Sequence, residues 1–328
     1  MSNSKRKILV TGGAGYIGSA CAEYLLDKGC EVVVFDSLVT GHASAVEPRA
    51  KFVKGDLGDR EALLKLVDGA GFDAIMHFAA FSLVGESMED PGKYFRNNVA
   101  NGINLLDAAV RGKIGRFVFS STAATFGLPE KMPIAEDAPQ IPINPYGESK
   151  LCFEKILSWY GKLHGIKYTA LRYFNAAGAT AKFGEHHKTE THLVPLILQV
   201  ALGKREHIKI YGDDYPTPDG TCVRDYIHIL DLAQAHYLAL DAPRDGHYNL
   251  GTGNGFSVKE IIEMARAVTG HAIPAVTAQR RPGDPATLIS SSALAKKELG
   301  WKPAFEDVRK IISSAWDWTK RNPSGYPD

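Results

Sequence analysis

The sequence predicts an α/β protein built on a doubly wound parallel sheet, with a smaller C-terminal lobe. Short β-branched runs alternate with amphipathic patterns through the first half of the chain, and a glycine-rich turn follows the first run. After about residue 175 the alternation loosens. Alternating strand and helix patterns are typical of parallel sheets covered by helices on both faces.

The elements follow in order along the chain. Apolar runs bounded by turn residues are predicted to be buried parallel strands, namely residues 7–10, 31–35, 51–53, 74–78, 117–120 and 168–173. The segments between them show helical periodicity and are predicted to be helices, namely residues 17–28, 60–67, 91–109 and 149–163. Beyond residue 175, loops such as 213–220 and 279–285 predict the smaller lobe.

Composition excludes several classes of function. The 328 residues include 38 Lys and Arg against 37 Asp and Glu, so no charge excess draws the chain to nucleic acid or to a membrane surface. No apolar run is long enough to span a bilayer, and the N-terminal run is too short for a signal peptide. The four cysteines lack metal-ligand spacing, which favours a reduced, cytoplasmic protein.

The turn Thr11-Gly-Gly-Ala-Gly-Tyr-Ile-Gly18 predicts a dinucleotide site of the Rossmann type. Glycines at 12, 15 and 18 provide the tight turn, the close approach of phosphate to backbone N–H groups, and helix–strand contact. The next strand pattern ends in Asp36, which can accept hydrogen bonds from a ribose and would repel a 2′-phosphate. These features favour NAD over NADP; the alternative is a glycine turn that serves packing alone.

Further strand ends lie on the same predicted rim. Asp56 follows the third strand, and Phe78-Ala79-Ala80 follow the fourth. Both segments are candidate cofactor contacts because ligands bind at the carboxyl ends of parallel strands. Either could instead be ordinary loop residues.

The pair Tyr146 and Lys150 is the candidate reactive centre. The residues are one helical turn apart, and the strand upstream delivers Ser120, Ser121 and Thr122 to its carboxyl end. A lysine ammonium favours the phenolate of a nearby tyrosine, which could then take a proton from a sugar hydroxyl that Thr122 aligns. The alternative is a tyrosine that only packs at the helix start.

An internal control shows that spacing alone does not define this pair. Tyr24 and Lys28 are also four residues apart, but they lie toward the C-terminal end of the first helix, away from the phosphate end. No serine or threonine strand end accompanies them. We therefore expect Tyr24 and Lys28 to be ordinary surface residues.

Several motifs together resemble the extended short-chain dehydrogenase/reductases. They are TGGAGYIG, Asp36, FSSTAATFG (119–127), NPYGESK (144–150) and LRYFNAAG (171–178). VGES (84–87), YFRNNV (94–99), DGTCVRDYIH (219–228) and RRPGD (280–284) narrow the resemblance to the UDP-glucose 4-epimerase (UDP-galactose 4-epimerase) family. The resemblance extends from residue 8 to the end of the chain.

The resemblance implies a full set of site residues. The implied catalytic residues are Thr122, Tyr146 and Lys150. The implied NAD contacts are Gly12, Gly15, Tyr16, Ile17, Asp36, Ser37, Asp56, Leu57, Phe78, Ala79, Ala80, Asn98, Ser120, Tyr146, Lys150, Tyr173 and Phe174. The implied contacts to the UDP-sugar are Thr122, Asn175, His192, Leu193, Tyr211, Arg224, Tyr226, Arg281 and Asp284.

Arg224 and Arg281 have independent chemical support. A UDP-sugar carries a diphosphate, and guanidinium groups pair with phosphate oxygens through paired donors. The alternative is that both arginines form structural ion pairs. The segment 185–192 holds acids and histidines without helical ligand spacing, and we expect no metal there.

The chain departs from well-known family members at four positions. Thr122 stands where they carry serine, which preserves the hydroxyl, and Phe126 replaces a common tyrosine. Ser82 stands where some members place a cofactor-side lysine, so that contact is not expected here. Leu288 stands where some members close the sugar pocket with tyrosine, and smaller residues there accompany acceptance of N-acetyl sugars.

The implied activity is reversible C4 epimerisation of UDP-glucose and UDP-galactose through a transient 4-keto sugar, with tightly bound NAD. UDP-pentoses or UDP-N-acetylhexosamines are alternative substrates, and a non-catalytic NAD-binding regulator is the alternative outside enzymes. A 4,6-dehydratase is disfavoured because Ala123 and Ala124 follow Thr122, where such enzymes resemble Thr-Asp-Glu.

The resemblance also implies a domain division and an assembly. Residues 1–175 are expected to bind NAD and residues 176–328 the nucleotide sugar, with about 222–250 crossing back to the first domain. A homodimer is expected to form through the helices predicted at 91–109 and 149–163.

Overall fold

A parallel seven-stranded sheet forms the centre of the molecule in the computed structural model, which describes residues 5–281 and 284–327. The strand order is β10-β6-β5-β4-β1-β2-β3. The strands are β1 Lys7–Thr11, β2 Glu31–Asp36, β3 Lys51–Lys54, β4 Ala74–His77, β5 Arg116–Thr122, β6 Lys167–Tyr173 and β10 Gly246–Leu250. The order reverses between β1 and β4, and ligands bind such sheets at this point, beyond the carboxyl ends of the strands.

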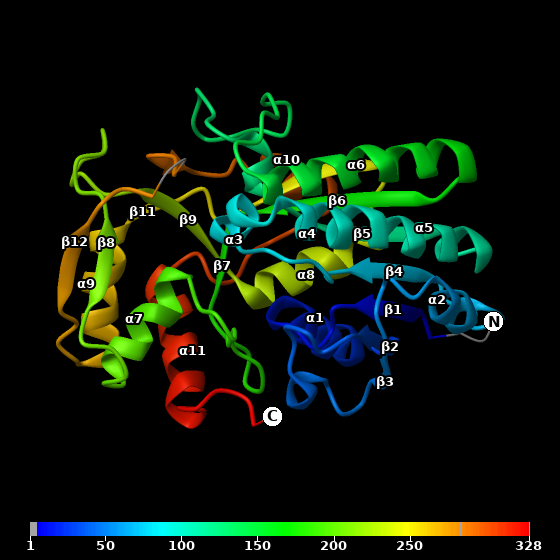
Figure 1. The fold of residues 1–328 in the computed structure, drawn as a ribbon, viewed down its shortest axis with the longest axis horizontal. Coiled ribbons are helices and arrows are strands. Elements are labelled where there is room, and N and C mark those ends of the chain that lie inside the picture. The colour runs from blue at the N-terminus through cyan, green and yellow to red at the C-terminus, as the bar shows by residue number, and fades with distance from the viewer. Residues whose placement is uncertain (1–4, 282–283, 328) are drawn as a thin grey trace.

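Helices cover both faces of this sheet, as Figure 1 shows. Side chains alternate along β1, so Ile8 and Val10 join the core beneath α1 (Tyr16–Asp27) and α8 (Ile229–Ala239). Leu9 joins the opposite core, beneath α2 (Arg60–Val67), α5 (Asn101–Arg111) and α6 (Pro145–His164). Near-continuous apolar strands are expected where both faces are buried. The predicted doubly wound α/β fold is confirmed.

The predicted strands form, with ends that differ by one or two residues. The largest difference is β5, which includes Ser121 and Thr122 as well as the predicted 117–120. The predicted helix 60–67 matches α2. The predicted helix 91–109 is confirmed in part: α4 (Pro91–Tyr94) continues through a π-helical stretch, η2 (Phe95–Ala100), into α5.

The predicted start of the helix at residue 149 was wrong. α6 begins at Pro145, because the Asn144 Oδ1 accepts a hydrogen bond from the Gly147 N–H (2.8 Å) and proline suits the first helical position. Tyr146 therefore lies in the first turn of α6, one turn before Lys150.

The expectation that Tyr24 is an ordinary surface residue was also wrong. Tyr24 is half-buried, and its ring lies 6.0 Å from that of Tyr237 on α8. The Lys28 Nζ lies 5.1 Å from the centre of the Tyr24 ring. The Tyr24 ring thus contributes to the contact between α1 and α8, whereas Lys28 is exposed, as predicted.

A second group of elements lies beyond the carboxyl edge of the sheet, at the left in Figure 1. β7 (Asn175–Ala177), β9 (Val223–His228), β11 (Gly255–Ser257) and β13 (Thr287–Leu288) form one sheet, and β8 (Ile208–Tyr211) pairs with β12 (Ala275–Ala278). α7 (Leu193–Ala201), α9 (Val258–Thr269) and α11 (Val308–Arg321) enclose their own apolar core.

Shorter elements lie in the connections between the longer ones. They are η1 (Ala43–Ala45), α3 (Val84–Glu89), η3 (Ala123–Phe126) and α10 (Ala293–Glu298). α8 and β10 follow the second group's first strands in sequence but pack with the large sheet. The division of the chain near residue 175 stays a prediction. Residues 282–283 of the RRPGD motif lie outside the described residues.

Neither a membrane span nor a disulfide occurs within residues 5–281 and 284–327. No helix described there is both long and apolar enough to cross a bilayer. Cys21, Cys30, Cys152 and Cys222 are all free thiols.

Candidate active site

The glycine turn between β1 and α1 forms a cradle that side chains would fill. Gly12 has φ +77°, and a Cβ there would lie 2.4 Å from the Ala79 backbone nitrogen. A Cβ at Gly18 would lie 2.2 Å from the Gly12 carbonyl oxygen. The N-cap of α1 is Gly15, and no side chain caps this helix end. Its first N–H groups are therefore available to phosphate oxygens, as a dinucleotide requires.

Asp36 ends β2 beside this turn. Its Oδ2 accepts a hydrogen bond from the Ala14 N–H (3.0 Å) and its Oδ1 accepts one from the Leu38 N–H (2.8 Å). Burial raises the pKa of Asp36, although these two hydrogen bonds oppose the rise. Each oxygen keeps a further lone pair for a ribose hydroxyl, and the carboxylate would repel a 2′-phosphate. The turn and the acid together fit NAD.

The other predicted cofactor contacts have different surroundings. The exposed Asp56 Oδ1 accepts from the Gly58 N–H (2.7 Å), as a loop residue does, so that alternative stays open. Asn98 is buried, and its amide bonds the N–H and carbonyl of Phe81 (2.9 and 3.0 Å) and the Ser149 hydroxyl (3.1 Å). Asn98 thus fastens the segment after β4 to α6.

The structure brings Tyr146 and Thr122 together at the carboxyl end of β5. Thr122 is buried and Tyr146 half-buried, and Thr122 Oγ1 also accepts a hydrogen bond from the Ala124 N–H (3.1 Å). Burial raises the pKa of Tyr146, whereas its hydrogen bond with Thr122 lowers it. The phenolate therefore depends on positive charge nearby, because burial alone disfavours it.

Lys150 is the residue predicted to provide this charge. Its Nζ donates to the Ser120 carbonyl oxygen (2.8 Å) and lies 4.8 Å from the centre of the Phe119 ring. Burial lowers the pKa of Lys150 to about 7, and the negative charge of Glu154 opposes the shift. Lys150 is thus poised near neutral pH, which is typical of groups at functional sites.

Aromatic residues of β6 and its extension line the same strand end. The Tyr173 hydroxyl donates to the Ser120 Oγ. Phe174 packs in a small apolar cluster with Ala123 and Phe126, and Leu288 lies against this cluster. Leu288 also pairs with Arg224 across β13 and β9, so it joins the apolar cluster to the predicted sugar side.

The predicted substrate residues meet in pairs. Arg224 forms an ion pair with Asp284 and donates to the Val223 carbonyl oxygen (2.9 Å). The Arg281 guanidinium lies 4.1 Å from the centre of the Tyr211 ring. Asn175 and Tyr226 are register partners on β7 and β9. An ion pair of Arg224 is also expected if the arginines serve only the structure. The contact of Arg224 with a diphosphate therefore stays a prediction.

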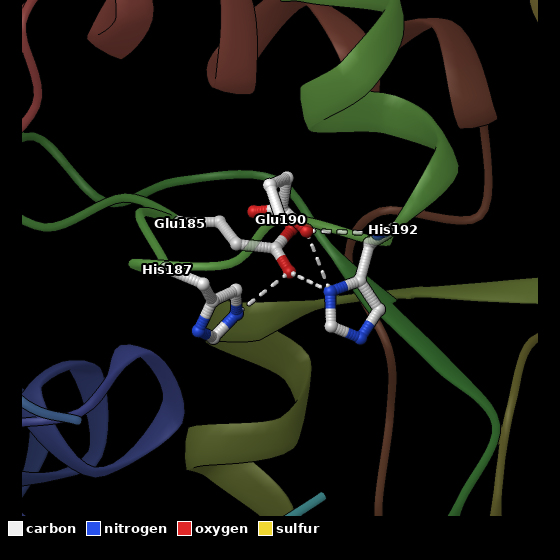
Figure 2. Close-up of side chains that lie close together, drawn as sticks. All are labelled: Glu185, His187, Glu190 and His192. Atoms are coloured by element: carbon white, nitrogen blue, oxygen red, sulfur yellow. Dashed lines mark hydrogen bonds and ion pairs between the residues drawn. The ribbon is translucent and has the colours of Figure 1, made fainter. Parts of the chain in front are cut away.

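A cluster of Glu185, His187, Glu190 and His192 precedes α7 (Figure 2). The Glu185 Oε1 lies 3.1 Å from His187 Nε2 and 3.0 Å from His192 Nδ1, and the Glu190 Oε1 lies 2.9 Å from His192 Nδ1. The four ligand-type atoms lie within 4.8 Å of one another. The acids and histidines of this segment are visible in the sequence, but their spacing did not predict that these four side chains would meet.

The contacts favour ion pairs over a shared cation. The Glu190 Oε1 already accepts from the N–H groups of Thr191 and His192, both at 2.8 Å. Burial would lower the pKa of His192, but Glu185 and Glu190 outweigh it and raise that pKa above its ordinary range. The second ring nitrogen of His192 points away from both carboxylates (Figure 2).

Glu154 and Arg172 are the main residues near the site that sequence reasoning missed. Both side chains are 2% exposed and their charged atoms are 2.6 Å apart. Glu154 is one turn beyond Lys150 on α6, so the four-residue spacing was a signal.

Comparisons with known proteins agree on one family. The model of the NAD dependent epimerase/dehydratase family matches residues 8–251. A UDP-glucose 4-epimerase from Streptococcus mutans is 56% identical over 98% of this chain and 99% of its own. A crystal structure of a UDP-glucose 4-epimerase superposes with a TM-score of 0.96 at 51% identity, covering 98% of this chain and 100% of the other. The structure of a Brucella ovis UDP-glucose 4-epimerase in complex with NAD gives 0.92 at 45% identity, with 95% and 98% covered.

Proposed function

The chain belongs to the NAD dependent epimerase/dehydratase family, and we propose that it interconverts UDP-glucose and UDP-galactose by inverting C4 of the hexose. The observation that carries this proposal is the pairing of Tyr146 with Thr122 at the carboxyl end of β5, beside Lys150. The glycine turn and Asp36 provide a cradle for NAD at the same edge of the sheet.

The residues of the site divide the proton chemistry between them. Tyr146, as phenolate, takes the proton of the 4-hydroxyl, and Thr122 aligns that hydroxyl by hydrogen bonding. The Lys150 ammonium stabilises the phenolate through its charge. NAD, held by the glycine turn and Asp36, would supply the hydride chemistry, in which the hydride leaves C4 and returns to the opposite face of the 4-keto sugar. Tyr146 then gives its proton back to the C4 oxygen, so the net reaction is redox-neutral.

Inversion at C4 requires that the enzyme binds the nucleotide tightly and the hexose weakly. Arg224 and Arg281 are proposed to hold the diphosphate, with Asp284 releasing or sharing Arg224. The apolar cluster around Phe174 and Leu288 offers the sugar few fixed hydrogen bonds. A 4-keto sugar could therefore turn over while its nucleotide stays bound.

A dehydratase remains the alternative of the same architecture. Removing water across C5 and C6 needs an acid–base pair beside the threonine. Here Thr122 caps η3, whose first residues are Ala123 and Ala124. This geometry supplies no carboxylate at those positions, which favours epimerisation.

We also propose that the chain works as a homodimer of two-domain protomers in the cytoplasm. Residues 1–175 with α8 and β10 would bind NAD, and the rest of the chain the nucleotide sugar. The two protomers would meet through α5 and α6. The exposed Trp159 and Leu163, one turn apart on α6, support this surface.

The test of the activity is a conversion assay without added NAD. Purified protein should convert UDP-galactose to UDP-glucose, because the cofactor is retained. Tyr146→Phe should lower kcat by at least about 10²-fold, the usual contribution of acid–base catalysis. Tyr24→Phe is the matched control with the same spacing to a lysine, and it should stay active. No conversion by the wild type, even with NAD added, would contradict the proposed function.

Leu288 is the residue with which to test sugar specificity. We expect Leu288→Tyr to lower conversion of UDP-N-acetylgalactosamine about tenfold relative to UDP-galactose, because the added ring fills the space that an acetamido group needs. The measurement compares initial rates on the two hexoses and on a UDP-pentose. An unchanged ratio in the variant would show that Leu288 does not border the sugar.

A further inference from the structure

We propose that Glu154 is a positioning residue for this reaction, holding α6 against the strands at the reactive edge and keeping Lys150 charged. The proposal rests on the proposed function. Glu154 touches neither the predicted substrate nor the predicted cofactor contacts directly.

The carboxylate of Glu154 is saturated by partners from separate elements. Its Oε1 accepts from the Ser121 hydroxyl of β5 (2.5 Å) and from the Arg172 Nε of β6 (2.9 Å). Its Oε2 accepts from an Arg172 terminal nitrogen (2.6 Å), with the Gln140 Nε2 at 3.4 Å and the His247 Nε2 of β10 at 3.3 Å. One side chain thus ties α6 to three neighbouring strands of the sheet.

Because side chains alternate between the two faces of a strand, the bonds of Glu154 also fix the positions of active-site residues on β5 and β6. Ser121 lies between Ser120 and Thr122 on β5, so its side chain points to the opposite face of the sheet. Arg172 is the register partner of Ser121, and Tyr173 is the partner of Thr122. Glu154 therefore binds β5 and β6 from one face of the sheet, and the predicted site residues Ser120, Thr122 and Tyr173 point to the other face. Tyr146 and Lys150 belong to the helix that it anchors.

Charge gives Glu154 a second effect. Burial lowers the pKa of Lys150 to about 7, and the charge of Glu154 opposes that shift from one helical turn away. Although burial acts to raise it, Arg172 and His247 hold the pKa of Glu154 below its ordinary value. Glu154 therefore stays a carboxylate at neutral pH.

Among the described residues, Glu154 is the one negative charge that shifts the pKa of Lys150. His77 on β4 is buried, and its pKa is lowered to about 3 by burial and by Lys150, so it is neutral. The Phe119 ring and the Ser120 carbonyl oxygen, which the Lys150 Nζ contacts, carry no charge.

Stability alone does not require this arrangement. Apolar pairs of similar volume often replace buried ion pairs without loss of stability, because desolvation offsets much of the attraction. The buried Glu154 is therefore better explained by its charge near Lys150 and by its bonds that hold α6 to the strands.

The experiment is the pH dependence of kcat for Glu154→Gln, which keeps the size and an acceptor oxygen but removes the charge. Lys150 should then lose its proton at lower pH, and the Tyr146 phenolate should be less favoured. In the pH profile of kcat, we expect the alkaline limb to move to lower pH and the acid limb to higher pH, each by about one pH unit. At pH 8, kcat should be about tenfold lower than in the wild type. KM for UDP-galactose should change less than twofold.

Two further variants separate positioning from mere folding. In Glu154→Gln the buried Arg172 guanidinium has lost its carboxylate partner. The double variant Glu154→Gln/Arg172→Gln removes that unpaired charge, so it should be more thermally stable than the single variant but keep the narrowed pH profile of kcat. Tyr160→Phe is the matched control, because it removes a hydrogen bond from α6 to Asp107 (2.7 Å) without changing charge near Lys150. It should lower stability and leave the profile unchanged.

The outcomes are distinguishable. A narrowed profile in both charge variants supports the proposal. A wild-type profile in the folded double variant would overturn it while leaving the proposed function intact. A wild type that does not epimerise contradicts the proposed function instead.

Discussion

His192 illustrates how a single side chain can be prepared for an anion. Its Nδ1 faces the carboxylates of Glu185 and Glu190, and the other ring nitrogen points away from them. Two carboxylates at hydrogen-bonding distance favour the imidazolium. His192 is predicted to contact the UDP-sugar, and a charged donor directed away from its counter-ions suits a substrate that carries a diphosphate.

We expect Glu185→Gln to make KM for UDP-galactose depend on pH. The folded-state pKa of His192 lies above its ordinary value, so the wild-type imidazolium persists through neutral pH and is lost only as pH rises through that higher value. In the variant the pKa of His192 falls, and KM should rise severalfold between pH 7 and 9 with kcat little changed. Steady-state kinetics at several pH values test this.

His187→Gln is the control for that experiment. It removes the other imidazole on Glu185 but leaves both carboxylates on His192. A KM that is flat with pH in Glu185→Gln as well would show that His192 does not bind the substrate as a cation.

Among the elements, the turn from β1 into α1 is the most constrained by local geometry. Gly12 and Gly29 both have positive φ, +77° and +82°, so alanine is strained at either position. A Cβ at Gly12 would meet the Ala79 backbone, whereas nothing lies within 4 Å of a Cβ at Gly29. The two positions thus separate backbone strain from the shape of the cradle.

We expect Gly12→Ala to lose retained NAD and activity, since the turn must move away from Ala79. Gly29→Ala should keep both and lose only about 1 kcal/mol of unfolding free energy. The measurement is the nucleotide released per protomer on denaturation, alongside thermal unfolding. A full complement of nucleotide in Gly12→Ala would contradict the cradle.

For the molecule as a whole, buried neutral histidines make the free energy of unfolding depend on pH in the acid range. Burial lowers the pKa of His77 to about 3, that of His228 to about 4 and that of His236 to about 4. Below pH 6.5 the unfolded chain binds protons that the folded chain does not, so the free energy of unfolding should fall from pH 6.5 towards 4.

His236→Gln should weaken this acid dependence by about 1 kcal/mol per pH unit, because one of these histidines no longer titrates. Denaturant unfolding of wild type and variant at pH 7, 6 and 5 measures the difference in slope. Equal slopes would show that His236 is protonated in the folded protein too.

Assembly is the other property of the whole molecule that can be tested. Trp159 and Leu163 are 59% and 72% exposed on one face of α6, where a homodimer is proposed. Replacing both by glutamate should halve the mass measured by light scattering at micromolar concentration. Val276→Glu, at an exposed apolar residue on β12, is the control and should leave the mass unchanged. A monomeric wild type would contradict the dimer.

Local patterns in the chain predicted the sheet, the glycine turn and the Tyr146–Lys150 pair. Glycine φ angles, strand alternation and helical spacing are properties of neighbouring residues, so they can be read from a few positions at a time. The start of α6 was also local, because Asn144 and Pro145 are an ordinary cap and first residue, but their signal was overlooked.

Contacts between distant residues could not be read in this way. The bond of Lys150 to Ser120 spans 30 positions, the Arg224–Asp284 pair 60, and the bonds of Glu154 to Ser121 and Arg172 33 and 18. Burial also moves the pKa values of Tyr146 and Lys150 in directions that spacing does not reveal. Such partners and burial depend on how helices and strands meet in space, and no short stretch of sequence contains that information.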